Sequence, residues 1–281
     1  MTPLNPIVLT ITLGALGSAA SAGGISQLCP AADLDGSGAI DGSDLGAMLL
    51  AWGPCAPNEL PCFAADLNGD AAVDGADLGD LLLAWGPVPQ FDSGPSYKDE
   101  EAWQIGLEML GPAGALTLAQ ELYDRVDQDL DAIRAFEPDL VGETHTLAWV
   151  PNQLIVSVSS SMPHDGYDCL NSYYQVTDID PLFGTIYVLT FASNINVEAL
   201  AAEYSALPEV IFAEPNGLIG GQNFWTPTPG PNGVWQWEID DGFTDCFDGC
   251  DCHNLYVFRT NAAGAVQLVS FEQFGQPWCD F

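Results

Sequence analysis

The sequence predicts an α+β protein of several domains, and three patterns support this class. A motif of closely spaced acidic residues, each time followed by a Leu-rich stretch, occurs twice near the start of the chain and predicts a small all-α unit. Apolar residues at helical spacing come next, and β-rich runs around one further helical pattern follow them. The last part of the chain combines short β-rich runs with a group of cysteines. A length of 281 residues gives room for about two domains.

Residues 1–22 have the pattern of a secretory signal peptide. An apolar run over residues 7–16 is too short to cross a bilayer, and the small residues Ala20, Ser21 and Ala22 suit a cleavage site. No Lys or Arg precedes the run, so a buried helix or strand is the alternative. No other apolar stretch is long enough to cross a bilayer. We therefore expect a secreted protein without a membrane span, either extracellular or held at the cell surface.

The charge balance is strongly acidic. The chain has 4 Lys and Arg residues against 39 Asp and Glu residues, a formal net charge of −35. Such a chain repels nucleic acids and anionic membranes, so a nucleic-acid-binding function is excluded. The self-repulsion also destabilises a compact state. Bound divalent cations would offset this repulsion locally, and a solvated acidic surface suited to a saline medium is the other explanation.

The chain has eight cysteines, and an even number in a secreted protein indicates disulfides. Three lie early and five lie late: Cys29, Cys55 and Cys62, then Cys169, Cys246, Cys250, Cys252 and Cys279. Because both groups are odd, complete oxidation within the chain requires at least one disulfide between the two halves. Otherwise some thiols stay free or pair with another chain.

The acidic motif forms two twelve-residue loops, 33–44 and 66–77. Oxygen-bearing side chains stand at positions 1, 3, 5, 9 and 12 of each loop, and position 7 offers its backbone carbonyl. The residues of the first loop are Asp33, Asp35, Ser37, Ala39, Asp41 and Asp44. Those of the second are Asp66, Asn68, Asp70, Ala72, Asp74 and Asp77. This is the ligand spacing of an EF-hand loop, so we expect the loops to bind two Ca²⁺ ions. An acidic turn without a metal would not explain why the spacing repeats.

A helix is expected after each loop. Leu45, Leu49 and Trp52 recur at helical spacing, and Gly-Pro then ends the helix. The matching residues of the second copy are Leu78, Leu82 and Trp85. Since two short helices cannot bury their apolar faces alone, the copies should pack together. Ile40 and Val73 at position 8 are apolar, as expected if the two loops pair and face the core there.

Residues from about 29 to 87 resemble the type I dockerin family. The resemblance rests on two EF-hand-like copies in register, on Asp in place of Glu at position 12, and on no obvious helix before either loop. It implies a calcium-loaded module, here residues 23–88, that docks onto a cohesin-like protein module. The chain departs from the family at Ser37, a neutral ligand, and at Ala71, where Gly is expected for a sharp turn. The partner-selecting positions 10 and 11 hold small residues, Gly42-Ser43 and Gly75-Ala76.

Residues 89–97 contain Pro, Gly and Ser and predict a linker, and residues 98–140 predict a helical segment. The apolar stripe of its longer helix is formed by Leu118, Leu122, Val126, Leu130 and Ile133. Four acids lie mostly off this stripe: Asp124, Asp127, Asp129 and Asp131. A solvated helix face explains these acids, and a metal site is the alternative.

Residues 141–220 predict an α+β domain. The β-rich runs 154–158 and 185–191, a helix capped by Asn196 and a short strand at 210–213 define its main elements. With a further strand near 176–179, the order is strand, helix or loop, strand, strand, helix, strand. This order is the ferredoxin-like split βαβ arrangement.

Residues from about 147 to 220 also resemble the propeptide domain of subtilisin-type proteases. The resemblance rests on three segments, Pro151–Val156, Gly184–Leu189 and Leu207–Asn216, of which the last ends in Ala-Glu-Pro-Asn. It implies binding to a subtilisin-like protease as an inhibitor or chaperone. The rest of the chain has no Gly-Thr-Ser-Met-Ala-type nucleophile segment, so reuse of the fold as a scaffold is the alternative.

Residues 221–281 predict a β segment that carries disulfides. A strand over 234–239 is followed by a hairpin with its turn at 261–264. A zinc site is one interpretation of four residues between these strands: Cys246, Cys250, Cys252 and His253. Their spacing is not that of common structural zinc sites, and a secreted chain favours disulfides. We expect the Cys246–Cys250 disulfide first.

We expect a non-catalytic protein with no catalytic residues. None of the three histidines lies in a recognisable nucleophile or zinc-hydrolase motif. His164 and Asp165 near Ser159 can be drawn as a triad, but a polar loop explains them as well. Two functions stay open, a calcium-dependent anchoring protein and a regulator of an extracellular protease. A small hydrolase with an unrecognised site is a third.

Overall fold

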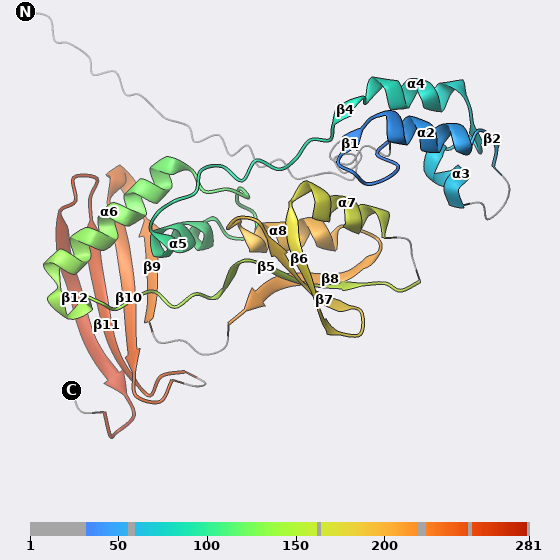
Figure 1. Ribbon diagram of the computed structural model, residues 1–281. Coiled ribbons are helices and arrows are strands. Elements are labelled where there is room, and N and C mark those ends of the chain that lie inside the picture. Colours follow the sequence, from blue (N-terminus) through green and yellow to red (C-terminus); the bar gives the residue numbers. More distant parts are fainter. Residues whose placement is uncertain (1–31, 56–59, 162–163, 219–222, 247–248, 280–281) are drawn as a thin grey trace, which may run out of the picture.

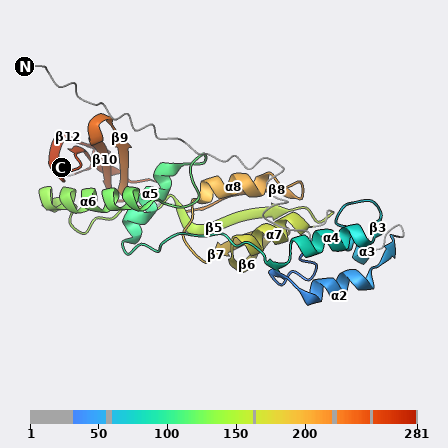
Figure 2. The same cartoon turned by 90° about the horizontal axis from the view of Figure 1, so that it is seen from above.

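The computed structural model describes residues 32–55, 60–161, 164–218, 223–246 and 249–279. Over these residues the protein is α+β, as predicted, with helices beside several β-sheets. A small helical unit lies at one end of the molecule, and a four-stranded sheet with a long helix lies at the other (Figure 1). A second four-stranded sheet lies between them, as the view from above also shows (Figure 2). The expected signal peptide, residues 1–22, lies outside the described residues.

The small helical unit is built from two copies, and each short strand of one copy pairs with a strand of the other. Its helices are α2 (Gly42–Leu50), α3 (Leu60–Ala65) and α4 (Gly75–Leu83). Its two-residue strands are β1 (Ala39–Ile40), β2 (Gly53–Pro54), β3 (Ala72–Val73) and β4 (Gly86–Pro87). Strand β1 pairs with β4 and β2 pairs with β3, so each loop pairs with the Gly-Pro segment that ends the other copy. The two loops therefore do not pair directly with each other, although Ile40 and Val73 are buried. Helix α3 enters the second loop, where no helix was expected.

The buried face of α2 and α4 differs from the one that the Leu and Trp spacing predicted. Helix α2 buries Asp44 and Met48, whereas Leu49 is 53 % exposed and Trp52 is 47 % exposed. Helix α4 buries the equivalent residues, Asp77 and Leu81. The reason is the twelfth loop residue, which points into its own loop and so turns the residue four positions later toward the core. Each helix therefore buries a face that includes an aspartate and leaves larger apolar side chains exposed to solvent.

Residues 89–97 are attached at both ends and are not a free linker. The Phe91 N–H donates to the Tyr173 carbonyl at 2.9 Å, and its ring lies 5.1 Å from that of Tyr174. Tyr97 is buried and stacks on Tyr123 at 4.2 Å. The aromatic residues within this Pro- and Gly-containing stretch thus bind it to two different cores.

The predicted helical segment and the C-terminal β segment form one unit. Its helices are α5 (Glu100–Leu110), α6 (Gln120–Phe136) and the short η1 (Pro138–Leu140). Its strands are β9 (Asn223–Pro229), β10 (Trp235–Phe243), β11 (Cys252–Thr260) and β12 (Val266–Gly275), with η2 (Pro231–Gly233) between β9 and β10. The sheet is antiparallel in the order β12-β11-β10-β9. One core joins helices and sheet, and Leu130, Trp225 and Trp237 are among its members. The chain between them therefore lies as an insertion within this unit.

The inserted part is the α+β domain. Its elements are β5 (Trp149–Val158), α7 (Asp165–Tyr173), β6 (Val176–Phe183), β7 (Ile186–Phe191), α8 (Val197–Ser205) and β8 (Val210–Gly217). The sheet order is β6-β7-β5-β8, all antiparallel, which is the order of a split βαβ arrangement. Asn196 caps α8 by accepting the Ala199 N–H at 3.2 Å. Helices and strands enclose a separate core around Leu154, Leu189 and Tyr204.

Candidate metal centre

The first acidic loop brings three carboxylates together. Oxygen atoms of Asp33, Asp35 and Asp44, at positions 1, 3 and 12, all lie within 4.8 Å of one another. Backbone N–H groups hold two of these side chains in place. Asp33 accepts from Ser37 and Gly38, both at 3.0 Å, and Asp35 accepts from Ser37 at 3.0 Å. The loop thus winds around its acids before any cation is considered, as an oxygen-lined calcium loop requires.

Asp44 closes the first loop. It is fully buried, and one of its oxygens accepts the N–H groups of Leu34 at 2.7 Å and Asp35 at 3.2 Å. Its other oxygen accepts the Asp41 N–H at 2.8 Å, while Asp41 accepts the Ser43 N–H at 2.7 Å. This reciprocal pair is a capping box at the start of α2. One aspartate therefore fixes both the helix start and the end of the loop, which explains why the shorter Asp suits position 12.

The second loop repeats this arrangement. Asp77 is buried and accepts the N–H groups of Leu67 at 2.9 Å, Asn68 at 3.2 Å and, through its other oxygen, Asp74 at 2.8 Å. Asp74 caps α4 by accepting the Ala76 N–H at 2.8 Å. The repetition of individual hydrogen bonds supports a common design for the two loops.

Position 6 is a sharp left-handed turn in both loops. Gly38 has φ +82° and Ala71 has φ +70°. The Ala71 N–H donates to Asp66 at 2.8 Å, as the Gly38 N–H donates to Asp33. Ala71 therefore makes the contact that Gly makes in the first loop, at the cost of a backbone conformation that residues with a Cβ disfavour.

The middle positions of the loops are placed by local contacts. Ser37 Oγ donates to the Ala39 carbonyl at 3.1 Å, so the hydroxyl and the position 7 carbonyl lie side by side. In the second loop, Asp70 accepts the Ala72 N–H at 3.0 Å, and Asn68 accepts the Asp70 N–H at 2.9 Å. Local hydrogen bonds thus link position 3 to position 5 and position 5 to position 7 in each loop.

The electrostatics of the first loop favour a cation. Burial raises the pKa of Asp33, and the charges of Asp44 and Asp35 raise it further, against the N–H groups of Gly38 and Ser37 that lower it. Closely spaced carboxylates thus repel one another in the folded loop, and a cation would remove this repulsion.

In the second loop, hydrogen bonding dominates at position 12. Burial alone would raise the pKa of Asp77, but the N–H groups of Asp74, Asn68 and Leu67 outweigh it and the pKa is lowered. Hydrogen bonding therefore favours the ionised form of Asp77.

Disulfides occupy the cysteines that a zinc site would need. Cys246 pairs with Cys250, as predicted, and Cys252 pairs with Cys279. Both ring nitrogens of His253 are also engaged, Nδ1 with Asp240 at 2.7 Å and Nε2 with the Cys250 carbonyl at 2.9 Å.

The early and middle cysteines are oxidised as well. Cys55 pairs with Cys62 and fixes α3 to the end of the first copy. Cys169 is also disulfide-bonded. The expectation of a disulfide between the two halves depends on Cys29, which lies outside the described residues.

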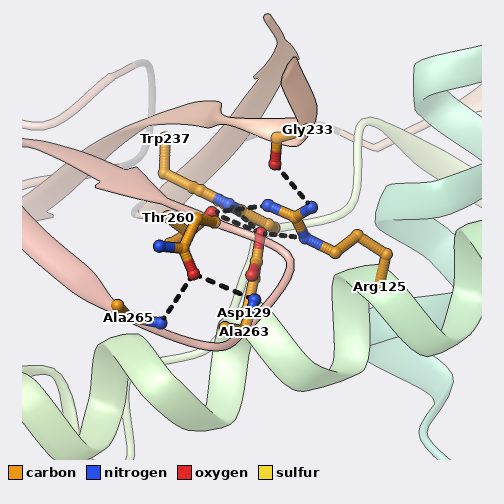
Figure 3. Close-up of polar contacts among 8 residues, drawn as sticks. Arg125, Asp129, Gly233, Trp237, Thr260, Ala263 and Ala265 are labelled. Carbon is orange, nitrogen blue, oxygen red and sulfur yellow. Dashed lines mark hydrogen bonds and ion pairs between the residues drawn. The ribbon is translucent and has the colours of Figure 1, made fainter. Parts of the chain in front are cut away.

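Asp129 is the residue that sequence reasoning misplaced most clearly. Among the four aspartates expected on a solvated helix face, it is fully buried. Its Oδ2 accepts from Arg125 Nε at 3.0 Å, Trp237 Nε1 at 2.9 Å and Thr260 Oγ1 at 2.6 Å (Figure 3). Arg125 also donates to the Gly233 carbonyl at 3.0 Å. The cluster joins α6 to the sheet and is structural. The available signal was an Arg four residues before an Asp on an otherwise acidic helix.

His164 and His145 both contact groups of the protein through their ring nitrogens. His164 Nε2 contacts the Ser159 carbonyl oxygen at 2.6 Å, whereas the Ser159 hydroxyl contacts Ser161, so no His–Ser hydroxyl pair exists there. His145 is buried, with Nδ1 accepting the Trp225 N–H at 3.1 Å and Nε2 at 2.9 Å from Glu108. It joins α5 to β9 and plays a packing role.

Comparison with known proteins gives no match: no family model matches the chain, and no curated protein and no solved structure match it. Among the described residues, no helix combines the length and apolar character needed to cross a membrane.

Proposed function

We propose that this is a secreted, non-catalytic protein whose dockerin-like unit binds two Ca²⁺ ions and anchors the chain to a cohesin-like module of an extracellular assembly. The observation that carries the proposal is the repeated loop architecture. Each loop has a buried position 12 aspartate that both closes the loop and starts a helix. Calcium would be held by the side chains at positions 1, 3, 5, 9 and 12 and by the position 7 carbonyl.

An exposed apolar surface on α2 and α4 supports the docking part of the proposal. Leu50 is 92 % exposed and Leu83 is 87 % exposed, at the same place in the two copies. The exposed side chains form one group at the C-terminal end of each helix, Leu49, Leu50 and Trp52 in the first copy and Leu82, Leu83 and Trp85 in the second. Such a concentration of exposed apolar side chains on a small unit marks an interaction surface. Because the chain carries a net charge of −35, a partner with basic residues around an apolar patch would be favoured.

Calcium titration of the full chain tests the first half of the proposal. Calorimetry should show two loop-binding events, and circular dichroism should show helix gained with calcium and lost on chelation. In the variant Asp33→Asn plus Asp66→Asn, both events should weaken by at least an order of magnitude, because each loop loses its first charged ligand. The exposed Asp92→Asn is the matched control and should change neither event. Equal binding in the loop variant would overturn the calcium assignment.

Docking is tested separately with purified cohesin modules. The wild-type chain should bind at least one module in a calcium-dependent way. The variant Leu50→Asp plus Leu83→Asp should lose this binding yet keep its calcium titration, because these side chains lie outside the loops. Calcium binding without cohesin binding would retain the module and reject the anchoring partner.

A second candidate function is inhibition of a subtilisin-like protease by the α+β domain. The hairpin between β6 and β7 favours it, because Leu182 and Phe183 are exposed there, Phe183 by 80 %. The full chain should then inhibit a subtilisin-type protease, and Phe183→Asp should weaken the inhibition. Cleavage of the substrate at an unchanged rate would reject this function.

A further inference from the structure

Strand β12 of the C-terminal sheet has one side that pairs with no other described strand. The sheet order β12-β11-β10-β9 makes β12 an edge strand, and Figure 1 shows it at the end of the molecule opposite the small helical unit. No backbone hydrogen bond joins its open side to another residue of the described chain. Alternate residues of such a strand direct their N–H and C=O groups outward, where a further strand can pair with them.

Strand β12 also lacks the proline that the other comparable edge strands contain. The two four-stranded sheets have four edge strands, β6, β8, β9 and β12. Three of them contain proline, namely Pro181 in β6, Pro215 in β8, and Pro227 and Pro229 in β9. Because proline has no N–H to donate, it hinders pairing with a further strand. Strand β12 contains no proline, and with 10 residues it is the longest of the four.

Part of β12 has the regular geometry that pairing requires. The only irregularity in its pairing with β11 is a bulge opposite Val257 and Phe258, and the register is regular from Ser270 to Gly275. Within this regular stretch the only charged side chain is Glu272, although the whole chain carries a net charge of −35. Two copies of the chain therefore repel each other less at this edge than at their acidic surfaces.

Exposed aromatic side chains border the open edge on both faces of the sheet. Phe271 is 44 % exposed on the face that packs against the core, and Phe274 is 46 % exposed on the other face. Phe271 lies 4.7 Å from Tyr256, Tyr256 stacks on Phe258 at 5.9 Å, and Phe258 lies 6.0 Å from Phe136 of α6. This row of rings extends the core as far as the edge, where it ends in solvent. A strand added beside β12 would cover Phe271 and Phe274 and so bury apolar area in addition to pairing the backbone.

We propose that β12 pairs antiparallel with β12 of a second copy of this chain, so that the two sheets join into one sheet of eight strands. A two-fold axis perpendicular to the sheet lets each strand supply the groups that the other needs, and it keeps the two helix-covered faces on the same side. With the axis at Phe271, the two Phe271 rings lie opposite each other and Glu272 lies opposite Ser270 of the copy. No like charges then face each other across the contact, and the row of rings continues from one copy into the next.

This pairing does not depend on the acidic loops, but it has a consequence for attachment. A dimer carries two dockerin-like units, so it would attach more firmly to an assembly that offers several cohesin-like modules. That consequence rests on the proposed function, whereas the dimer itself does not.

Sedimentation velocity of the full chain over a series of protein and salt concentrations tests the proposal. We expect a dimer that is favoured by salt, because salt screens the repulsion between two chains of net charge −35. In Ser270→Glu plus Phe274→Glu, the new carboxylates and Glu272 form a row on one face of the edge. Every antiparallel register that pairs these residues then places like charges opposite each other, so the dissociation constant of the dimer should rise at least tenfold. The matched control, Thr226→Glu plus Thr228→Glu, adds the same charges at exposed positions of the opposite edge strand β9 and should keep the dimer.

Hydrogen exchange of the wild type tests where the contact lies. Amide hydrogens within Ser270–Gly275 should exchange more slowly in the dimer than in the monomer, whereas those of β9 should not change. Circular dichroism checks that the β12 variant keeps its fold. A wild type that stays monomeric at every concentration and salt, or a dimer that persists unchanged in the β12 variant, would overturn the proposal. A dimer with unchanged exchange in β12 would place the contact elsewhere and would overturn it as well.

Discussion

The sixth position of the two loops offers a paired test of the loop geometry. Ala71 has φ +70°, and Gly38 has φ +82° at the same place in the first loop. A residue with a Cβ in this region costs roughly 1–2 kcal/mol, and a Gly there loses about 0.4–1 kcal/mol through the greater freedom of the unfolded chain. The balance is roughly 0.5–1 kcal/mol in favour of Gly. We therefore expect Ala71→Gly to stabilise the second loop and Gly38→Ala to destabilise the first by a similar amount.

No steric clash complicates this comparison. A Cβ placed on Gly38 meets no atom within 4 Å, so Gly38→Ala measures the backbone conformation alone. If the strain belongs to the closed loop, the calcium affinity should rise roughly two- to fivefold for Ala71→Gly and fall by the same factor for Gly38→Ala. Calorimetric titration of the full chain measures both. Changes of the same sign in the two variants, or a loss of affinity in Ala71→Gly, would refute the reasoning.

Three further predictions concern the rest of the molecule. Asp129→Asn should lower the free energy of unfolding by about 3 kcal/mol, the lower end of the range for a buried pair, because it leaves the partly buried Arg125 without its charge partner; denaturant titration with Trp fluorescence measures this, and the exposed Asp131→Asn should have little effect. Burial opposes ionisation of Glu108, but hydrogen bonds from His145 and other groups outweigh it and lower the pKa of Glu108 below its ordinary value of 4.5. The stabilisation by ionised Glu108 is therefore present above pH 4.5 and is lost as the pH falls through the lowered pKa. Unfolding titrations at pH 7 and at lower pH should show that acid destabilises the wild type more than Glu108→Gln. Cys246 of the oxidised full chain should bind no zinc, because its sulfur is bonded to Cys250. Zinc bound at Cys246 before reduction, in a metal-binding assay, would contradict the disulfide.

The loops were the part of the protein that local sequence described best. The oxygen spacing of the loops and the burial of Ile40 and Val73 follow from neighbouring residues in the chain. The same holds for the Cys246–Cys250 disulfide in the C-terminal segment. The predicted buried face of α2 was wrong, because the spacing of apolar residues does not show that Asp44 points inward to close its loop. Where a polar residue has a structural task, the hydrophobic pattern gives the wrong face of a short helix.

The remaining predictions failed where contacts join residues that lie far apart in the sequence. Asp129 looked like one more acid on a solvated face, since its partners Trp237 and Thr260 lie more than a hundred residues later in the chain. The pairing of Asn223 with Asp241 could not be predicted from the sequence either, because the two residues become neighbours only through the register of β9 and β10. Spacing within one element predicts that element, whereas a site built across strands depends on which strands pair.

The insertion of the α+β domain has a consequence for how function can be assigned. Helix α6 precedes this domain and strands β9–β12 follow it, yet they share one core with Trp225 and Trp237 buried at its centre. A chain cut near residue 220 to isolate the propeptide-like part would expose that core and separate Arg125 and Asp129 from the sheet that they hold. Loss of protease inhibition in such a fragment would therefore say little about the inhibitory surface. The exposed β6–β7 hairpin must be tested by substitution in the full chain, where the core that frames the domain stays intact.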